Sequence, residues 1–245
     1  MPAPRFFVSL ALSPSMAGTT VELPEAAAHH AVRVVRLAIG DALTLFNGRG
    51  GEYAATVAAV DKRGASARIV AFDPIERESP LAIVLAQVIA ANDAMDYAVR
   101  KAVELGVTAV QPLVTERSAP LPAGERSTRR HAHWQQVAIA ACEQCGRNRV
   151  PEIAAPQSLP AWLAAWQGSG IVFTADATTS FAALAQPAGP IALLVGPEGG
   201  LAVRDVAAAR AHEFLPVRLG PRVLRTETAG VAALAMLQAR WGDLR

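Results

Sequence analysis

The stretch Ile191-Ala-Leu-Leu-Val-Gly-Pro-Glu-Gly-Gly200 is the strongest local signal in the sequence. Its apolar beginning predicts a buried strand, and its glycines predict a tight turn before a helix over about 201–211. Open α/β sheets bind ligands at the carboxyl ends of strands, where glycines let the backbone approach a ligand closely. The segment contains neither a Walker pattern nor Gly-x-Gly-x-x-Gly. An ordinary tight turn explains the same residues, so both interpretations stay open at this point.

Strands and helices alternate on the N-terminal side of this stretch. Such alternation predicts a largely parallel sheet that is covered by helices on both faces. Physical rules alone favour an unknotted, doubly wound sheet, because knotted chains are rare. We expect strands over Leu81–Ile89, Thr108–Val114 and Ile171–Thr174, and helices over about Asp93–Leu105, Thr128–Cys145 and Leu159–Trp166.

The first 73 residues have a different pattern, with short strand-like segments separated by Gly and Asp turns. They predict a small β-barrel with one helix. The polar stretch Asp73–Pro80, which has a proline at each end, predicts a linker, so we expect domains over 1–73 and 74–245. The expected strands are Phe6–Leu10, Ala42–Phe46, Glu52–Val60 and Ala67–Phe72, and the expected helix is Pro24–Leu37.

A second segment of interest, Leu219–Ala229, leads into the last helix of the chain. That helix is apolar on most sides, which indicates burial or an interface. Thr226 is expected to be its N-cap, and Glu227 in the first turn complements the helix dipole. Arg222 and Arg225 at the mouth of a buried helix suit an anion or a developing oxyanion, although a solvated arginine is the simpler interpretation.

The chain of 245 residues has a net charge of only +2, with 21 arginines and two lysines among its cations. Arginine matches phosphate groups bidentately, but a codon preference explains the same count. Residues 117–149 hold six arginines and two glutamates, an excess of four positive charges. This excess favours a surface that binds RNA phosphates, with an ordinary exposed helix face as the alternative.

The two cysteines, Cys142 and Cys145, are too few for a disulfide-rich secreted protein. We expect no metal site, because a second cysteine pair is absent and His131 and His133 point to different faces of a helix. No apolar stretch is long enough to cross a membrane, so a soluble, cytoplasmic protein is expected.

Taken together, these segments resemble the RsmE-type family of bacterial 16S rRNA uracil-N3 methyltransferases, in the SPOUT superfamily. The resemblance extends from one end of the chain to the other, and it is most specific in Leu194–Leu201 and Leu219–Ala229. The matching segments are Pro4–Val8, His30–Arg36, Lys101–Val107, Glu116–Ser118, Glu143–Arg147, Val150–Ile153, Leu194–Leu201 and Leu219–Ala229.

The resemblance implies a PUA-like β-barrel before residue 73 and an α/β domain with a deep trefoil knot. It also implies a homodimer with the active site at its interface, and S-adenosyl-L-methionine (S-adenosylmethionine) as the cofactor, bound in the knot. The expected cofactor-binding residues are Leu194, Val195, Gly196, Pro197, Gly199, Gly200, Leu219, Gly220, Val223, Leu224, Thr228 and Ala229.

Methylation of uracil N3 requires loss of the N3 proton, so a carboxylate base and a cation facing the uracil oxygens are chemically sensible. We expect Arg225 to be the cation and Glu143 or Glu198 to be the base. For Glu198 the alternative is a structural role, in which it shapes its loop and takes no part in proton transfer. The residues expected to bind 16S rRNA or the small ribosomal subunit are Arg5, Arg33, Arg36, Arg49, Arg117 and Arg147.

Other functions stay open at this stage. One is a non-catalytic RNA-binding factor of ribosome assembly, and another is a knotted methyltransferase that acts on a different RNA position. A nucleotide-dependent oxidoreductase is the weakest alternative, because the glycine pattern that such enzymes use for the pyrophosphate is missing.

Overall fold

The computed structural model of the chain describes residues 3–62, 64–120 and 124–244. Contacts divide the chain into two compact units. The first contains the residues up to Glu78 together with Cys142–Val150, and the second contains Ser79–Ala141 and the residues from Pro151 onward. A boundary between independently folding domains after residue 73 stays a prediction. No helix within the described ranges is long and apolar enough to cross a membrane.

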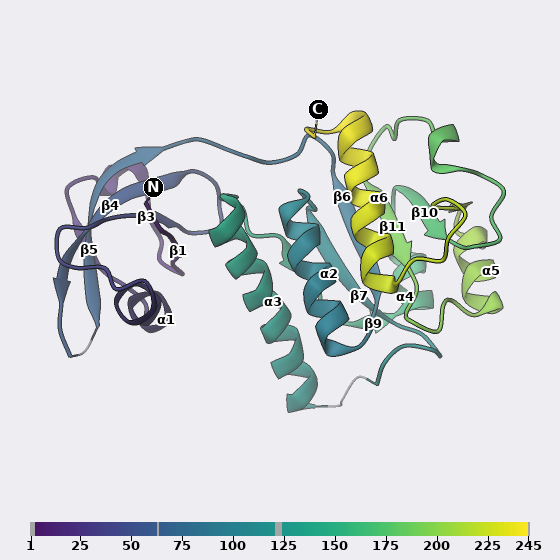
Figure 1. Ribbon diagram of the computed structural model, residues 1–245, viewed down its shortest axis with the longest axis horizontal. Coiled ribbons are helices and arrows are strands. Elements are labelled where there is room, and N and C mark those ends of the chain that lie inside the picture. Colours follow the sequence, from purple (N-terminus) through teal and green to yellow (C-terminus); the bar gives the residue numbers. More distant parts are fainter. Residues whose placement is uncertain (1–2, 63, 121–123, 245) are drawn as a thin grey trace. The chain divides into compact units, whose positions relative to one another are not determined.

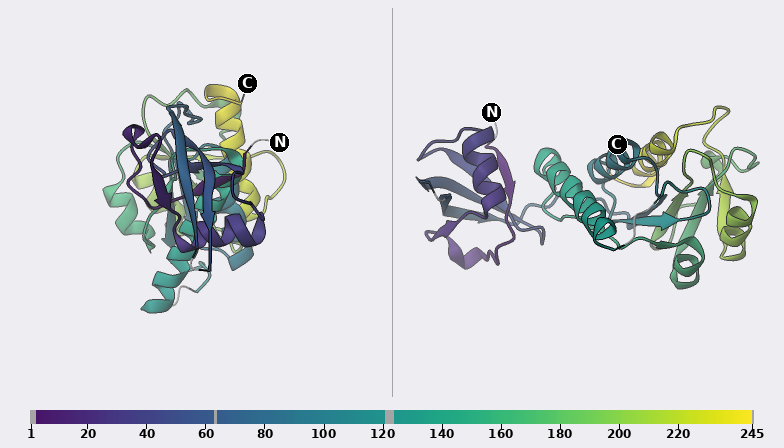
Figure 2. Two further views of the ribbon diagram at one scale, coloured as in Figure 1. Left: turned by 90° about the vertical axis from the view of Figure 1, so that its left-hand side faces the viewer. Right: turned by 90° about the horizontal axis from the view of Figure 1, so that it is seen from below.

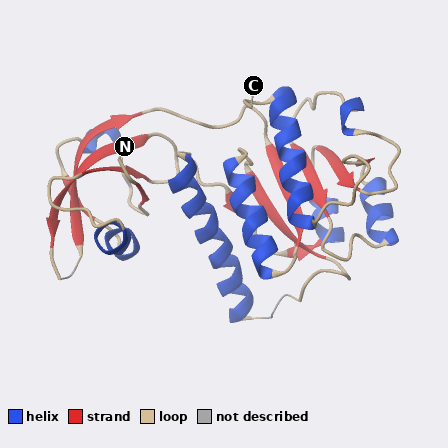
Figure 3. Cartoon of the chain, in the orientation of Figure 1, coloured by secondary structure: helices blue, strands red, loops and turns tan. Residues whose placement is uncertain are grey.

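The first unit is built on a sheet whose described strands lie in the order β1-β3-β4-β5-β2. β1 is parallel to β3, and the other neighbours are antiparallel. Residues in the first half of β4 are buried alternately, as expected where one face of a sheet covers a core. Figure 3 shows that these strands are strongly curved. Their bounds are β1 (Arg5–Phe7), β2 (Thr20–Glu22), β3 (Ala42–Phe46), β4 (Glu52–Val60) and β5 (Ala65–Asp73).

The helix expected over Pro24–Leu37 is shorter and irregular. It consists of α1 (Glu25–His29) and a wider π-helical turn, η2 (His30–Val34). Arg36 has a φ of 63°, a left-handed conformation that a regular helix cannot contain, and it therefore stops the helix. A single 3-10 turn, η1 (Pro14–Met16), precedes β2.

The segment Cys142–Val150 is held in the first unit by buried polar contacts. Asn148 is fully buried; it accepts a hydrogen bond from Arg5 at 2.6 Å and donates one to the Ile75 carbonyl at 2.8 Å. Arg147 pairs with Glu78. The expected linker Asp73–Pro80 is thus fixed by side chains that lie some seventy residues later in the sequence.

The second unit is a parallel sheet with the described strands in the order β12-β10-β11-β6-β7-β8, and β9 also pairs with β7. β11 is buried along its whole length, which explains why its five residues are all apolar. The strands are β6 (Ile83–Val88), β7 (Ala109–Val114), β8 (Glu152–Ile153), β9 (Gln157–Ser158), β10 (Ser169–Phe173), β11 (Ile191–Val195) and β12 (Phe214–Val217). The helices are α2 (Asn92–Glu104), α3 (Glu125–Cys145), α4 (Leu159–Ala165), η3 (Phe181–Ala183), α5 (Val203–Ala211) and α6 (Thr226–Trp241).

The two faces of this sheet carry different helices. Ala86 and Val88 belong to the core that α4 and α5 complete, whereas Leu85 lies under Gly230 of α6. Successive strand residues point to opposite faces, so α6 and its neighbour α2 cover the face opposite to α4 and α5. Figure 1 shows α2 and α6 side by side, and the right-hand view of Figure 2 shows α4 and α5 across the sheet.

After the edge strand β12 the chain returns to the centre of the sheet, where α6 packs on α2 and β11. A loop over residues 218–225 makes this return across the carboxyl ends of the strands. Gly230 permits a close approach of α6 to the sheet, because a Cβ there would lie 3.2 Å from Leu85 Cδ1. Whether the chain forms the expected trefoil knot stays a prediction.

Candidate functional site

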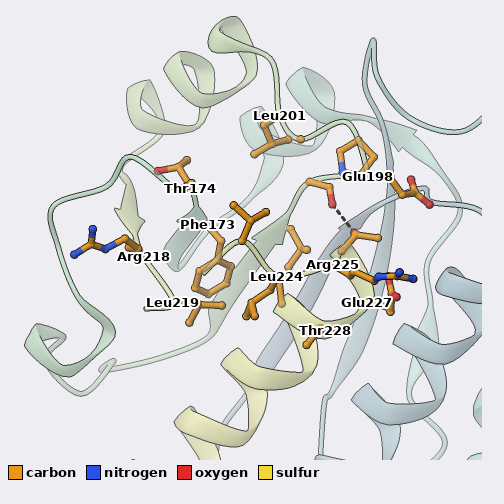
Figure 4. A pocket seen from close by; sticks show the side chains of 18 of the residues that line it. Phe173, Thr174, Glu198, Leu201, Arg218, Leu219, Leu224, Arg225, Glu227 and Thr228 are labelled. Carbon is orange, nitrogen blue, oxygen red and sulfur yellow. Dashed lines mark hydrogen bonds between the residues drawn. The ribbon is translucent and has the colours of Figure 1, made fainter. Parts of the chain in front are cut away.

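A pocket of about 1350 Å³ lies in the second unit, at the carboxyl ends of β10, β11 and β12. The loop after β11, the loop before α6 and the beginning of α2 complete its wall. Figure 4 shows side chains that line it, among them those of Phe173, Leu219 and Leu224. A ligand site at this edge of a parallel sheet is what the glycine-rich stretch predicted.

The loop that follows β11 is tightly packed on one side and open on the other. A Cβ on Gly196 would lie 3.0 Å from the Leu201 backbone, so the turn requires glycine there. Gly200 has a φ of 69° and free space beside it. Glu198 accepts a hydrogen bond of 2.8 Å from the amide of Ala91, the residue before α2. This bond fixes the loop to the beginning of α2, as expected of a glutamate that shapes its loop.

The loop before α6 forms the opposite wall. Gly220, at φ 86°, lies in open space, and Val223 is 88 % exposed. Arg225 is the N-cap residue of α6, and its exposed side chain lines the pocket.

The prediction that Thr226 is the N-cap was wrong. Thr226 is the first residue of α6, and its hydroxyl donates a hydrogen bond of 2.5 Å to the Gly196 carbonyl. The hydroxyl therefore joins the two walls of the pocket instead of capping its own helix.

Most of the expected cofactor-binding residues line this pocket. Leu194 instead faces the core under α4 and α5, and Gly199 lies beside Arg117, which donates a hydrogen bond to its carbonyl at 3.2 Å. The ones that line the pocket are Val195, Gly196, Pro197, Gly200, Leu219, Gly220, Val223, Leu224, Thr228 and Ala229.

Sequence reasoning missed one wall of the pocket. Phe173 ends β10, Thr174 to Asp176 follow it, and Asp93 and Tyr97 lie on the first turns of α2. The hydroxyl of Thr174 is buried and has no hydrogen-bond partner in the described chain. The strand preceding this wall was predicted, but its place beside β11 depends on the strand order, which no local pattern reveals.

Glu143 is not among the residues that line the pocket and belongs to the first unit. Its Oε1 accepts a hydrogen bond of 2.9 Å from the Phe7 amide, and its Oε2 lies 3.9 Å from His30 Nδ1. Burial raises the pKa of Glu143, although the Phe7 amide, His30 and Arg5 act in the opposite direction. This carboxyl therefore holds its proton more readily than an exposed glutamate.

The structure divides the expected RNA-binding arginines of the first unit into two groups. Arg147 and Arg5 are internal: their side chains are 5 % and 14 % exposed and pair with Glu78 and Glu52. Each pairs with a carboxylate of its own unit, and RNA binding by these two arginines stays a prediction. Arg33, Arg36 and Arg49 are exposed.

Within the second unit, part of the basic segment is also engaged. Arg130 donates hydrogen bonds to the carbonyls of Pro120 and Ala90 and lies over the Trp134 ring. Arg129 pairs with Glu125 on the helix surface. Two of the arginines of residues 117–149 in this unit are thus engaged with the protein itself, and RNA binding by this segment stays a prediction.

The cysteines and histidines of α3 have separate roles. Burial raises the pKa of Cys142 to about 12, which leaves its thiol inert, and the thiol contacts the Arg149 carbonyl. His131 binds the Ile153 carbonyl and His133 binds Asp96, so the two histidines do face different neighbours.

Comparisons with known proteins agree with this arrangement. Residues 77–238 match the family described as RNA methyltransferase domain, and residues 23–70 match the RNA methyltransferase PUA domain. Ribosomal RNA small subunit methyltransferase E of Buchnera aphidicola is 32% identical over 98% of both chains. Its counterpart in Bacillus subtilis is 28% identical, again over 98% of both.

Two solved structures are similar over the full length of both chains. The enzyme of the same name from Neisseria gonorrhoeae, bound to S-adenosyl methionine, is 37% identical with a TM-score of 0.91. A putative methyltransferase from Legionella pneumophila, in complex with the same cofactor, is 36% identical with a TM-score of 0.95.

The raised pKa of Glu143 predicts a pH-dependent stability. The folded chain protonates this carboxyl at a higher pH than the unfolded chain, so ionised Glu143 lowers the free energy of unfolding at neutral pH and not in acid. Glu143→Gln keeps an oxygen for the Phe7 amide and removes the charge. We expect the first unit of this variant to be more stable than wild type at neutral pH, with the difference closing below pH 4.5.

Hydrogen exchange of the β4 and β5 amides measures this difference. Glu22→Gln changes an exposed carboxylate of the same unit and is the control, for which no gain is expected. An equal gain in stability for Glu143→Gln at neutral pH and below pH 4.5 would contradict a raised pKa of Glu143 as its cause.

Proposed function

Because the chain belongs to the ribosomal RNA small subunit methyltransferase E family, we propose that it methylates N3 of a uridine in 16S ribosomal RNA with S-adenosylmethionine as the methyl donor. The observation that carries the proposal is the pocket at the carboxyl ends of β10, β11 and β12, walled by the loops 196–200 and 219–225. These are the two segments on which the family resemblance is most specific.

The residues present fit this cofactor. Leu219 and Leu224 offer apolar surface for an adenine ring, and the open space beside Gly200 and Gly220 gives a ligand access to the backbone. The unpaired hydroxyl of Thr174 is suited to a polar group of the ligand, because buried hydroxyls normally have a partner. S-adenosylmethionine supplies an electrophilic methyl group to such a site.

The chain's own contribution is alignment and charge. Holding two reactants in line supplies roughly 7–11 kcal/mol of a barrier when their geometry is favourable. Loss of the N3 proton leaves negative charge on the uracil oxygens, and Arg225 at the positive end of α6 is placed in the pocket wall to stabilise it. Glu143 and Glu198 are the candidate acceptors of the proton. The one whose exchange for glutamine abolishes methyl transfer but not cofactor binding is the base.

We also propose a homodimer. The neighbouring helices α2 and α6 expose Tyr97 and Met236, which are 42% and 41% accessible, and large apolar side chains of this kind favour an interface. Sedimentation of the purified protein should give twice the chain mass of 25.6 kDa, and a monomer at all concentrations would exclude the dimer.

Since bacterial ribosomes are assembled in the cytoplasm, we place the protein in that compartment.

The central prediction is a methylation product at one nucleotide. Purified protein, S-adenosylmethionine and small ribosomal subunits or free 16S rRNA should yield N3-methyluridine, detected by mass spectrometry of the digested RNA. The same experiment shows which form of the RNA is the substrate. Calorimetry without RNA should detect cofactor binding, and its absence at millimolar ligand would contradict the proposal.

Arg225→Ala should lower the rate of methyl transfer at saturating cofactor about 100- to 1000-fold, the usual effect of removing one group that stabilises an oxyanion. The affinity for S-adenosylmethionine and the melting temperature should change little, because Arg225 is exposed. Arg129→Ala, at an exposed arginine paired with Glu125, is the matched control. Unchanged turnover of Arg225→Ala would remove this residue from the mechanism.

We propose that Arg33, Arg36 and Arg49 bind RNA phosphates. Replacing all three with glutamine should weaken RNA binding and lower the slope of log affinity against log salt by about 2–3, since each phosphate contact contributes about 0.7–0.9. Folding stability should be retained. Arg147→Gln should instead lower the folding stability, because it leaves Glu78 without its partner inside the first unit. Unchanged RNA affinity of the triple variant would refute the assignment.

A further inference from the structure

Gln87 is a polar residue in the apolar strand β6. It is fully buried, and it does not line the pocket. Its side chain lies on the face of the sheet that α6 covers, where a Cβ on Gly230 would be 3.7 Å from Gln87 Oε1. A buried amide in the middle of a parallel sheet calls for a reason, because an apolar side chain of the same size would fill the space without polar groups to satisfy.

The amide nitrogen of Gln87 begins a chain of hydrogen bonds that ends in the pocket. Nε2 donates to the Val88 carbonyl at 2.9 Å and to the Thr226 hydroxyl at 2.9 Å. That hydroxyl in turn donates to the Gly196 carbonyl at 2.5 Å. Because the Thr226 oxygen accepts from Gln87, its single proton is directed to Gly196, and the two bonds support each other.

This chain connects the central strand β6 to the two segments that form the walls of the pocket. Gln87 belongs to the central strand β6, Gly196 begins the loop after β11, and Thr226 follows Arg225 at the beginning of α6. A displacement of Thr226 would therefore move both the loop 196–200 and the backbone of Arg225.

A second buried glutamine provides a contrast. Gln111, in the neighbouring strand β7, donates to the carbonyls of Pro112 and Ala155 and accepts a hydrogen bond from Gln157, so both ends of its amide are satisfied. Gln87 Oε1, in contrast, is buried without a hydrogen-bond partner among the described residues. An unpaired buried oxygen lowers stability, so the Gln87 amide is not explained by packing alone.

We propose that Gln87 is a positioning residue that fixes the two walls of the cofactor pocket relative to each other through the Thr226 hydroxyl. The inference rests on the proposed function, because the ligand whose affinity reports the position of the walls is S-adenosylmethionine.

The test compares Gln87→Leu with Gln111→Leu in the full-length protein. Both changes remove a buried amide of the same shape from adjacent strands, but only the first removes the bond to Thr226. We expect Gln87→Leu to weaken S-adenosylmethionine binding about tenfold by calorimetry, the change that corresponds to 1.4 kcal/mol. Gln111→Leu should lower the melting temperature at least as much and leave the cofactor affinity within about twofold of wild type.

Two changes at Thr226 test the route. Thr226→Val removes the hydroxyl at constant shape and should weaken cofactor binding as much as Gln87→Leu does. Thr226→Ser keeps the hydroxyl and should bind the cofactor with the affinity of the wild type. The double variant with Gln87→Leu and Thr226→Val should be no weaker than Thr226→Val alone, since both act through one bond chain.

The outcomes separate this inference from the proposed function. If wild-type protein fails to bind S-adenosylmethionine, the proposed function fails. If wild type binds and folded Gln87→Leu binds equally well, only the positioning role is overturned. Equal weakening by Gln87→Leu and Gln111→Leu would also overturn it, because the effect would then follow general destabilisation.

Discussion

The hydrogen bond from the Thr226 hydroxyl to the Gly196 carbonyl holds the beginning of α6 against the loop after β11 in the second unit. A chain that has reached the edge strand β12 must cross the carboxyl ends of two neighbouring strands before α6 can pack on β11. The crossing loop cannot pair with the sheet, so its end needs an anchor at the centre. Thr226 supplies the anchor, and the space enclosed between the crossing loop and the glycine-rich turn is the pocket. The ligand site is thus a consequence of how the chain end returns to the sheet.

The elements that could be predicted are those whose signals are local. β11 was predicted to the residue, because five apolar residues are followed by a glycine and a proline that cannot continue a strand. β2, β8 and β9 were missed, since two or three residues are too few for an alternating pattern. The strand order and the return of α6 to the sheet centre were not readable from the residues, because they depend on contacts between segments that are far apart in the sequence.

The difference between local signals and long-range contacts also explains which parts of the site could be predicted. The loop 196–200 was found through its glycines and the loop 219–225 through its arginines and the apolar helix that follows, and most of the expected residues do line the pocket. Thr226 was assigned to the wrong partner, because its acceptor lies thirty residues away and a cap is the nearest alternative that sequence offers. The Thr174 wall was missed for a related reason, as its position follows from the pairing of β10 with β11.

Arginine content, in contrast, does not show which arginines serve the fold, and the structure identifies two that do. Arg147 presents both Nε and an η nitrogen to the two oxygens of Glu78, a two-point contact that the single ammonium of lysine cannot make. Arg5 similarly reaches Glu52 and Asn148 at once. A codon preference would explain the number of arginines, but it would not explain these paired geometries. In the first unit, the planar guanidinium is used to hold Cys142–Val150 in place. The number of arginines that serve the fold therefore depends on the folded chain and cannot be read from the count.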